Sequence, residues 1–489
     1  MGSFTDIQYK AQFHPEFDLS QLDIALAQRG NRIPQNPRIC EIGFGMGLNL
    51  IQNAFDRNND VYGIDLIPEH ARFVNEALAA CGQHHPGQII CGDITDPRVC
   101  DSWPQFDVII MHGVWTWVSE PVRSGILDFF RAKLALGGIV FVSYNVASAW
   151  GQVAGVRPIL LEIYNRLSTF TDPAQRVERA FDFWASEVLK PLDQVVYDRV
   201  MKNRGLGAQY LAHEFLNEAW APSTLSEVAQ AFRSADLKFL SSARLVSQHP
   251  SLTAIDDHDL YHPIGQVVDD VFKLTHQDAI QRSSFRTDIF QKGLWLNDQR
   301  SFPGDISIVR VADAIDVKPI KTGNVTRQVG DETIDYFNTI PPEGIVLSDL
   351  ADDLKKSFNY GSNDVLTFLH ILRRFFVFRR YFEHSEELDQ RSVDLNNWIQ
   401  QNYPSLNYRH SPAVNGFVAL TDFETTLYSV RELSSSAQLE RLKALAGNLS
   451  ITKGGKELTE EHEKFNYLAE KLESFHNSRL GYLQTLRIW

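Results

Sequence analysis

Cysteine is scarce in this chain of 489 residues, and the four that occur all lie in the first hundred, at positions 40, 81, 91 and 100. They show no CxxC spacing, and no histidine pattern nearby would complete a zinc site. The sequence therefore argues against a metal site or a disulfide framework. We expect no metal and four free thiols in a reducing cytoplasm.

Targeting and membrane segments are also missing. The first residues, Met1-Gly-Ser-Phe-Thr-Asp6, lack the charged and apolar regions of a signal peptide. Asp6 stands where N-myristoylation needs Ser or Thr. No uninterrupted apolar run reaches the roughly 18 residues that would span a bilayer. We therefore expect a soluble, cytoplasmic protein with no membrane insertion.

Basic residues are fewer than acidic residues. The chain has 47 Lys and Arg and 61 Asp and Glu, which gives a net charge of −14 at pH 7. This balance argues against broad attraction to nucleic acid or to anionic membranes, and it mildly favours a basic partner. Hydrophobic residues make up 44% of the chain and charged residues 22%, which is ordinary for a globular protein.

The most informative segment is Arg38-Ile-Cys-Glu-Ile-Gly-Phe-Gly-Met-Gly-Leu-Asn-Leu50, which reads as a buried strand, a glycine turn and a helix start. Such a turn brings backbone close to a ligand and points the N–H groups of the helix at it. A dinucleotide fingerprint would need glycine at position 48, which is leucine. Taken alone, the segment could also be a tight turn without a ligand.

Four further strands follow at helix-length intervals: Val61–Asp65, Gln88–Asp93, Phe106–Met111 and Gly138–Tyr144. The repetition of strand and helix predicts a parallel, doubly wound sheet. Asp65 and Asp93 end the second and third strands, where a carboxylate either contacts a ribose or adenine group or caps a helix. All the acids and glycines would meet in one crevice at the strand ends.

Taken together, the motif Glu41-x-Gly-x-Gly-x-Gly47 and the two strand-end acids resemble the cofactor site of class I S-adenosylmethionine (SAM) methyltransferases. The resemblance implies a seven-stranded Rossmann-like sheet with SAM as cofactor. It assigns cofactor contacts to Glu41, Gly43, Gly45, Gly47, Asp65, Leu66, Asp93, Ile94 and His112.

The length exceeds the roughly 200 to 250 residues that one such sheet needs, so we expect further bodies. We predict a SAM-binding core over 1–151, a helical insertion over 152–205 that covers substrate or forms a dimer, and completion of the sheet over 206–296. The sixth and seventh strands are expected at Lys238–Val246 and Phe285–Gly293. A helix-rich or winged-helix-like region should fill 297–489, with amphipathic helices in Leu347–Leu372 and Phe375–Phe382 and exposed helices at Leu439–Ala446 and Glu460–Phe475.

Aromatic residues follow the fourth and fifth strands, in His112-Gly-Val-Trp-Thr-Trp and Ser143-Tyr-Asn. An acceptor would sit there, at the carboxyl ends of the strands, and aromatic rings suit an alkyl-ammonium or aromatic group. The predicted substrate-binding residues are Trp115, Trp117, Tyr144, Asn145 and Trp220. The alternative for each tryptophan is plain loop packing.

The run from His112, with Tyr210-Leu-Ala-His-Glu-Phe-Leu-Asn-Glu-Ala-Trp220 and Phe285-Arg-Thr-Asp-Ile-Phe290, resembles methyltransferases that carry a methyltransferase regulatory domain. The similarity covers about residues 1 to 295. The best understood branch comprises bacterial protein-lysine methyltransferases, which are dimers, so the resemblance implies a protein-lysine acceptor and a homodimer.

A lysine acceptor must lose a proton first, because an ammonium with a pKa near 10.4 is neutral about once in 2500 at pH 7. The predicted proton acceptors are Tyr144, His112, His213 and Glu214. A His-Glu pair at a helix start also serves often as a structural element.

Three other functions stay open. The acceptor could be a small molecule or glycan, over which the insertion would close. RNA is a second option, because Leu372–Phe382 interleaves arginine with aromatics, although an amphipathic interface helix explains that segment better. A third is a SAM-binding scaffold without catalysis.

Overall fold

The computed structural model describes residues 11–55, 59–83, 87–217, 219–245, 269–293, 301–311, 315, 320–322, 325–327, 330–341, 344–373, 375–380, 385–446, 451–453 and 456–489. Within these residues, no helix combines the length and the apolar character that crossing a bilayer requires.

A seven-stranded sheet forms the centre of the molecule, in the order β3-β2-β1-β4-β5-β7-β6. The strands are β1 Arg38–Ile42, β2 Asp60–Asp65, β3 Ile89–Cys91, β4 Phe106–Met111, β5 Leu134–Asn145, β6 Leu237–Ser242 and β7 Phe285–Lys292. β1 to β5 run parallel, and β7 is antiparallel to both of its neighbours. The predicted fold class is confirmed.

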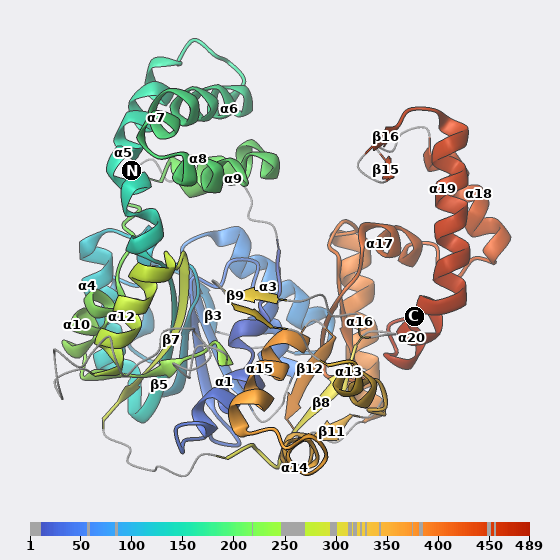
Figure 1. The fold of residues 1–489 in the computed structure, drawn as a ribbon, viewed down its shortest axis with the longest axis horizontal. Helices are drawn as coiled ribbons and strands as arrows, with labels where there is room; N and C mark the ends of the chain where they lie inside the picture. The colour runs from blue at the N-terminus through green and yellow to red at the C-terminus, as the bar shows by residue number, and fades with distance from the viewer. Residues whose placement is uncertain are drawn as a thin grey trace.

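Helices cover both faces of the sheet (Figure 1). One face packs against α1 Leu19–Ala27, α2 Leu48–Phe55 and α3 Pro68–Ala80. The other packs against α4 Glu120–Lys133, α10 Leu225–Arg233 and α12 Asp270–Gln281. Because both faces are covered, the central strands are continuously apolar, and Val108 to Met111 are all fully buried.

The predicted insertion is a separate group of helices with its own core, and it stands above the carboxyl ends of the strands in Figure 1. It comprises α5 Ala147–Arg166, α6 Pro173–Trp184, η4 Ala185–Leu189, α7 Lys190–Leu192, α8 Gln194–Met201, η5 Arg204–Leu206 and α9 Gly207–Phe215. These helices begin five residues before the predicted boundary at 152 and continue past the one at 205. As a division into domains, the four predicted ranges remain a prediction.

The C-terminal region begins with a three-stranded antiparallel sheet, β11-β8-β12, and three helices. Its elements are β8 Ile306–Arg310, β9 Ile320–Thr322, β10 Val325–Arg327, α13 Asp331–Asn338, β11 Ile345–Val346, α14 Leu347–Phe358, α15 Ser362–Leu372 and β12 Phe376–Arg380. The predicted amphipathic helix over Phe375–Phe382 is wrong, because the described part of that segment is strand β12. Phe376 and Phe378 alternate into the core beside β8, which is the two-residue period of a strand.

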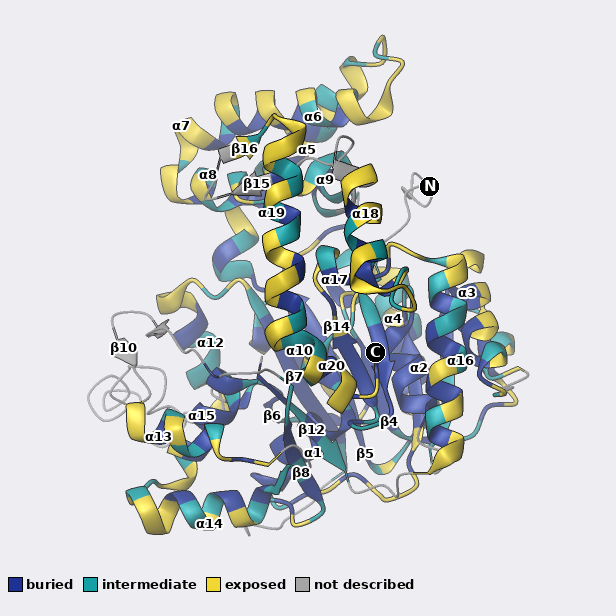
Figure 2. Ribbon diagram, turned by 90° about the vertical axis from the view of Figure 1, so that its right-hand side faces the viewer, coloured by how far each residue is buried: buried dark blue, intermediate teal, exposed yellow. Residues whose placement is uncertain are grey.

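The remaining elements are α16 Glu386–Asn402, β13 Tyr408–Ser411, β14 Gly416–Ala419, α17 Asp422–Tyr428, α18 Ser435–Ala446, β15 Ile451–Lys453, β16 Lys456–Leu458, α19 Glu461–Ser474, η9 Phe475–Arg479 and α20 Leu480–Thr485. The helices predicted around Leu439–Ala446 and Glu460–Phe475 are present as α18 and α19. Figure 2 shows that both helices expose much of their surface, whereas the central sheet is buried.

Helix α1 joins the sheet to the C-terminal region. All nine of its residues are buried, because the apolar core of this face continues from α2 and α3 through α1 to Phe376 and Phe378 on β12. At its centre the fully buried Asp23 pairs with Arg32 at 2.8 Å and with Arg380 of β12 at 3.7 Å. The first helix is therefore an internal element of the whole molecule.

Candidate functional site

Three glycines form the turn between β1 and α2, and all have positive φ: +67° at Gly43, +57° at Gly45 and +61° at Gly47. A Cβ at Gly43 would lie 2.5 Å from Val114 Cγ2, and one at Gly47 would lie 2.4 Å from Val74 Cγ2. A Cβ at Gly45 meets nothing within 4 Å. Gly43 and Gly47 are thus required by packing, while Gly45 faces open space where a ligand can approach.

Asp65, at the end of β2, holds this turn in place. Its Oδ2 accepts the Gly45 N–H at 2.9 Å, and its Oδ1 accepts the Ile67 N–H at 2.9 Å and lies 3.0 Å from His70 Nδ1. The carboxylate thereby positions both the glycine turn and the start of α3. Its predicted contact with a ribose remains a prediction. Leu66 beside it is 63% exposed, which is unusual for a leucine and suits contact with a flat ring.

Glu41 is a buried carboxyl group in the strand below the turn. Its side chain is 3% exposed, and its Oε2 has no hydrogen-bond partner among the described residues. Burial, with the nearby Asp65 charge, raises its pKa to about 8. An unpaired buried carboxylate is unfavourable, so the site fits a ligand that brings positive charge. SAM carries both a sulfonium and an ammonium group.

Asp93 and Ile94 follow β3. Asp93 is exposed, and its Oδ1 accepts hydrogen bonds from the Thr95 N–H at 2.9 Å and the Thr95 hydroxyl at 2.7 Å. Ile94 is half-buried. The acid therefore forms a local turn at the strand end, and the predicted contact with the adenine remains a prediction.

His112 lies at the end of β4 against the lead-in segment. Its Nδ1 is 2.9 Å from the Ser143 hydroxyl, which also accepts the Gly113 N–H at 2.8 Å. The ring centroids of His14 and Phe17 lie 4.2 and 4.8 Å from that of His112. Burial and the neighbouring His14 lower the pKa of His112 to about 3. The ring is neutral and only weakly basic, so the site does not support its predicted role as proton acceptor.

His14 and Phe17 were not predicted as site residues. They belong to the lead-in before α1, in which Pro15–Phe17 forms the short helix η1. Asn49 of α2 fixes the backbone of His14, because its Oδ1 accepts the His14 N–H at 2.9 Å and its Nδ2 donates to the His14 carbonyl at 2.8 Å. Nothing in the local sequence signals this contact, since 35 residues separate its two partners.

The surroundings of Tyr144 do not fit its predicted roles as proton acceptor and substrate-binding residue. Its side chain is fully buried, and its hydroxyl donates to Asp288 Oδ2 of β7 at 2.6 Å. Asp288 also pairs with the buried Arg286 at 2.7 Å, and Arg286 pairs with Asp278 at 2.9 Å. Burial and Asp288 raise the pKa of Tyr144 well above its ordinary value. Tyr144 therefore belongs to a buried structural network, in which its hydroxyl is engaged with Asp288.

The tryptophans divide into two kinds. Trp115 is 3% exposed and packs edge-on against Phe232 at 5.1 Å, so its predicted role in substrate binding is replaced by core packing. Trp117 and Trp220 stack, with centroids 5.6 Å apart and planes 13° apart, and Trp150 meets Trp220 at 5.8 Å. Trp150 was not among the predicted substrate-binding residues.

This aromatic cluster, Trp117, Trp150 and Trp220, packs with the core of the helical group. Its Trp117 comes three residues after Val114, and Val114 Cγ2 would lie 2.5 Å from a Cβ at Gly43 in the cofactor turn. The Trp220 Nε1 is buried without a hydrogen-bond partner among the described residues. Asn145 at the end of β5 is 8% exposed, and its carbonyl accepts the Ser223 N–H at 2.9 Å. That bond ties the segment after Trp220 to the sheet.

Glu214 lies on α9, in the helical group above the sheet. It is half-buried, and burial raises its pKa to about 7. It can therefore exchange a proton near neutral pH, as the sequence argument requires. The side chain of His213 lies outside the described residues, so its predicted role stays a prediction. No group of three or more His, Cys, Asp or Glu side chains in the described part of the chain could hold a metal ion.

Comparisons with known proteins bear directly on this site. The family profile described as a methyltransferase domain matches residues 40–142, and the one described as a predicted methyltransferase regulatory domain matches residues 207–292. An uncharacterized protein of Synechocystis is 26% identical over 518 residues, covering 100% of this chain and 99% of its own. An uncharacterized protein of Rickettsia prowazekii is 30% identical over 223 residues, covering 44% of this chain and 39% of its own.

Among solved structures, PKMT2 from Rickettsia typhi in complex with AdoHcy superposes with a TM-score of 0.63 at 16% identity, covering 98% of this chain and 99% of that one. At this identity the likeness shows the fold, which extends over nearly the whole chain. The methyltransferase profile spans β1 to β5, including the glycine turn, Glu41 and Asp65. The chain is therefore an S-adenosylmethionine-dependent methyltransferase of the class I fold that carries a methyltransferase regulatory domain.

Proposed function

We propose that the protein methylates lysine side chains of a protein substrate. The observation that carries the proposal is the aromatic cluster, whose Trp117 belongs to the loop after β4 that also brings Val114 to the cofactor turn. Stacked indole faces attract an alkyl-ammonium group and exclude water from it. The fold shared with PKMT2, a protein-lysine methyltransferase of Rickettsia typhi, supports the same acceptor.

In this proposal the site residues have separate roles in methyl transfer. Bound SAM supplies an electrophilic methyl group. Gly43, Gly45 and Asp65 fix the turn that holds it, and the aromatic cluster orients the acceptor amine and keeps water away. Generating a neutral lysine amine at pH 7 requires about 4.6 kcal/mol. An apolar aromatic surface lowers the amine pKa, and Glu214 is the group whose pKa suits it to accept the proton.

The acceptor class is tested by methyl transfer from tritiated SAM into a cell lysate that is then separated into protein, RNA and small molecules. We expect label in the protein fraction, on lysine Nζ by mass spectrometry. A lysate whose lysines have been blocked by acetylation serves as the control and should show no label on lysine. Label confined to small molecules, glycans or RNA would refute the lysine acceptor.

Replacing Glu214 by glutamine is expected to lower kcat by about 100-fold at pH 7, because a general base contributes roughly 10²–10⁴. SAM affinity should stay within about twofold of wild type. In the wild type kcat should rise with pH through about 7, the value to which burial raises the pKa of Glu214, and this rise should be absent in the variant. Glu187→Gln, an exposed change in the same helical group, is the matched control. Unaltered turnover would remove Glu214 from the mechanism, and His213→Ala would then be the next variant to measure.

Glu41→Gln separates the charge of the cofactor site from its shape. In the free protein Glu41 binds a proton up to a pH of about 8, so the cationic cofactor should release that proton on binding. Titration calorimetry at pH 7 in buffers of different ionisation enthalpy should therefore show up to one more proton released by wild type than by the variant. Equal proton release would contradict a cation beside Glu41.

The same substitution should also change how the stability of the cofactor-free protein depends on pH. Because the pKa of Glu41 is raised in the folded protein, its contribution is fully present below the ordinary value of 4.5 and is lost as pH rises through about 8. Relative to Glu41→Gln, the cofactor-free wild type should therefore lose stability between these two pH values.

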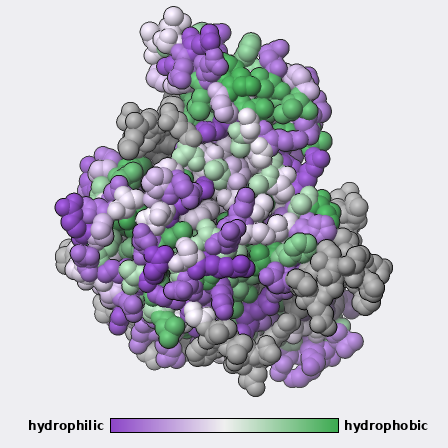
Figure 3. All heavy atoms as spheres, turned by 90° about the vertical axis from the view of Figure 1, so that its left-hand side faces the viewer, coloured by the Kyte–Doolittle hydropathy of each residue, from purple (hydrophilic) through white to green (hydrophobic). Residues whose placement is uncertain are grey.

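We also propose that the protein is a homodimer that associates through its helical group. Ile159, Phe183, Leu192, Val195 and Leu206 are between 43% and 59% exposed there, and Figure 3 shows hydrophobic side chains gathered over the upper, helical part of that face. An apolar patch of this kind is typical of an interface. Analytical ultracentrifugation at micromolar concentration should give twice the chain mass of 55.6 kDa.

We also propose a cytoplasmic location, which the free cysteines support. None of Cys40, Cys81, Cys91 and Cys100 forms a disulfide, and three of them are buried and would remain reduced in the cytoplasm. Cell fractionation tests the location.

A further inference from the structure

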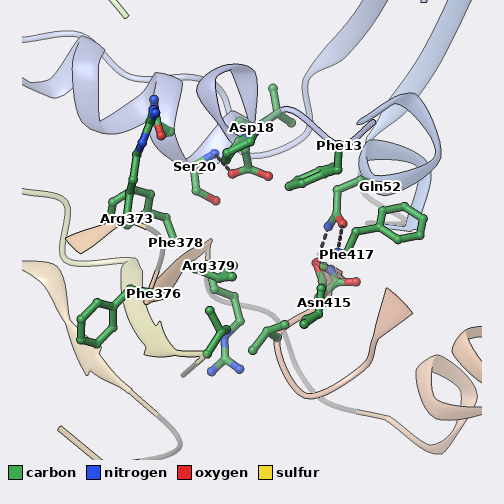
Figure 4. A pocket seen from close by; sticks show the side chains of 18 of the residues that line it. Phe13, Asp18, Ser20, Gln52, Arg373, Phe376, Phe378, Arg379, Asn415 and Phe417 are labelled. Carbon is green, nitrogen blue, oxygen red and sulfur yellow. Dashed lines mark hydrogen bonds between the residues drawn. The ribbon is translucent and has the colours of Figure 1, made fainter. Parts of the chain in front are cut away.

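A cavity of about 390 Å³ lies between two strands of the C-terminal region, β12 and β14, where these approach α2 and the lead-in segment. Its lining takes in five consecutive residues of β12, 376–380, and six at the start of β14 and before it, 414–419. Figure 4 shows Phe376 and Phe378 on one side of the cavity and Asn415 and Phe417 on another. Successive side chains of a strand point to opposite faces, so a wall of consecutive residues is a strand edge. The cavity therefore lies between two strand edges.

Half of the backbone groups of β12 are used in its pairing with β8. The Val311 N–H donates to the Phe375 carbonyl at 2.7 Å, and the antiparallel register continues from there, with Val377 opposite Val309. Hydrogen-bonded pairs alternate along an antiparallel ladder, so the odd-numbered residues of β12 direct their N–H and carbonyl groups toward β8. The even-numbered residues direct theirs to the opposite edge, on the side of the cavity.

That opposite edge of β12 is covered at one end only. The Arg380 N–H donates to the Ser20 hydroxyl of α1 at 3.2 Å. Within the described residues, the N–H and carbonyl groups of Phe376 and Phe378 make no hydrogen bond. The rings of both residues pack into the core, so they present backbone to this edge. An unpaired strand edge is a template for a further strand.

The facing edge, on β14, is already engaged by α2. Gln52 Oε1 accepts the Phe417 N–H at 2.9 Å, and Gln52 Nε2 donates to the Asn415 carbonyl. The volume of the cavity is in the range of sites for drug-sized ligands, which is enough for a few residues of an extended chain and too small for a folded partner. The open edge of β12 thus has room beside it for one short strand.

The cavity is close to the cofactor site. Gln52 follows Gly47 of the glycine turn by five residues, which is about 7.5 Å along α2. Phe13 lines the cavity, and the ring of the next residue, His14, lies 4.2 Å from that of His112. One residue of an extended chain spans about 3.3 Å. A polypeptide docked beside β12 can therefore reach the cofactor site within a few residues.

We propose that the open edge of β12 binds an extended segment of the acceptor protein as an added strand, a few residues from the lysine that is methylated. The proposal rests on protein-lysine methylation as the function of the site, and the short distance to the cofactor turn is what favours the acceptor as the occupant. Phe376 and Phe378 supply main-chain hydrogen bonds, which recognise an extended backbone in preference to a particular sequence. The enzyme would then select lysines next to extended segments over lysines within helices.

The binding test uses the full chain and the peptide acetyl-Val-Thr-Val-Thr-Val-amide, whose β-branched residues favour an extended backbone and which contains no lysine. Two derivatives carry two N-methyl groups each, on the second and fourth residues or on the second and third. Alternate methyl groups leave one edge of the peptide intact, whereas adjacent ones interrupt both edges. By titration calorimetry, the first derivative should bind within about threefold of the parent and the second at least about tenfold more weakly. Equal affinity of the two derivatives, or no binding of the parent at millimolar concentration, would overturn the added strand.

Hydrogen exchange measured by mass spectrometry locates the bound peptide. The parent peptide should slow exchange in fragments that contain Phe376 and Phe378 and leave α18 unchanged. Ala419→Trp, which puts a bulky group on an exposed residue of the lining, should weaken the peptide by about tenfold or more. Ala444→Trp, on the exposed side of α18, is the matched control and should bind as wild type does. Protection of β12 that rises with protein concentration in the absence of peptide would assign the edge to a second copy of the chain and overturn the proposal. The readings in wild type hold even if a variant fails to fold.

Methyl transfer connects the docked strand to the reaction. A peptide in which four glycines join the Val-Thr segment to a lysine should show a KM at least about tenfold below that of a glycine-lysine peptide of equal length. Equal KM values would overturn the docking role and leave lysine methylation standing. Failure of the proposed function is read separately, because the lysate test reports lysine acceptors without reference to β12.

Discussion

Replacing Gly45 by arginine is expected to abolish SAM binding while the protein stays folded. The substitution places a side chain on a residue with φ +57°, which is unfavourable by about 1 kcal/mol. A Cβ at this position meets nothing within 4 Å, so the arginine projects into the space where the cofactor approaches. It also adds a positive charge to the site in which we expect Glu41 to face the cationic cofactor. Calorimetry should detect no saturable binding, and Tm should fall by no more than roughly 4 °C.

Two neighbouring variants show whether the loss arises from blocking or from unfolding. Gly45→Ala carries the same backbone strain without the bulk and should retain most of the binding. Gly47→Val should instead destabilise the fold, because its Cβ would lie 2.4 Å from Val74 Cγ2. Normal SAM affinity in Gly45→Arg would mean that the cofactor does not lie against this turn.

Asp288→Ala is expected to lower the free energy of unfolding by about 3–5 kcal/mol, which is the usual loss when one partner of a buried ion pair is removed. Asp288 is fully buried and accepts from both Arg286 and the Tyr144 hydroxyl. The variant would leave a buried guanidinium with Asp278 alone and a buried phenol without its acceptor. Urea unfolding followed by circular dichroism measures the loss.

A double variant distinguishes the ion pair from simple packing. Arg286→Leu with Asp288→Leu removes both charges and should lose less stability than Asp288→Ala, because no charge remains uncompensated. Tyr144→Phe should cost about 1 kcal/mol and leave turnover unaltered, since its hydroxyl faces this network. A large fall in turnover for Tyr144→Phe at full stability would restore the catalytic role that the structure argues against.

The sheet was predictable because its signals are local. β4 lies at Phe106–Met111 as expected, and the other six strands overlap their predicted ranges. Apolar runs bounded by turn residues are sufficient for strands that are covered on both faces. The segment around Phe376 was predicted to be an amphipathic helix, but its pairing with β8 is set by residues some 70 positions earlier.

The cofactor turn was predictable for a similar reason, because the spacing of glycines in the sequence indicates the backbone conformation of the turn. The residues on the acceptor side of the site could not be predicted in this way. Tyr144 and Trp115 looked like site residues because they follow strand ends, but their surroundings are set by Asp288 and Phe232, more than 100 residues further along the chain. His14 escaped notice because only the fold brings it to His112.

The complete burial of α1 bears on how the protein is made. Its cover includes β12, so a ribosome that has just released the first helix must add about 350 more residues before that cover exists. At 5–20 residues per second this takes roughly 20 to 70 s. For that time a nascent segment rich in leucine and isoleucine lacks part of its final cover, and chaperones that bind nascent chains are suited to shield it until synthesis has passed Arg380.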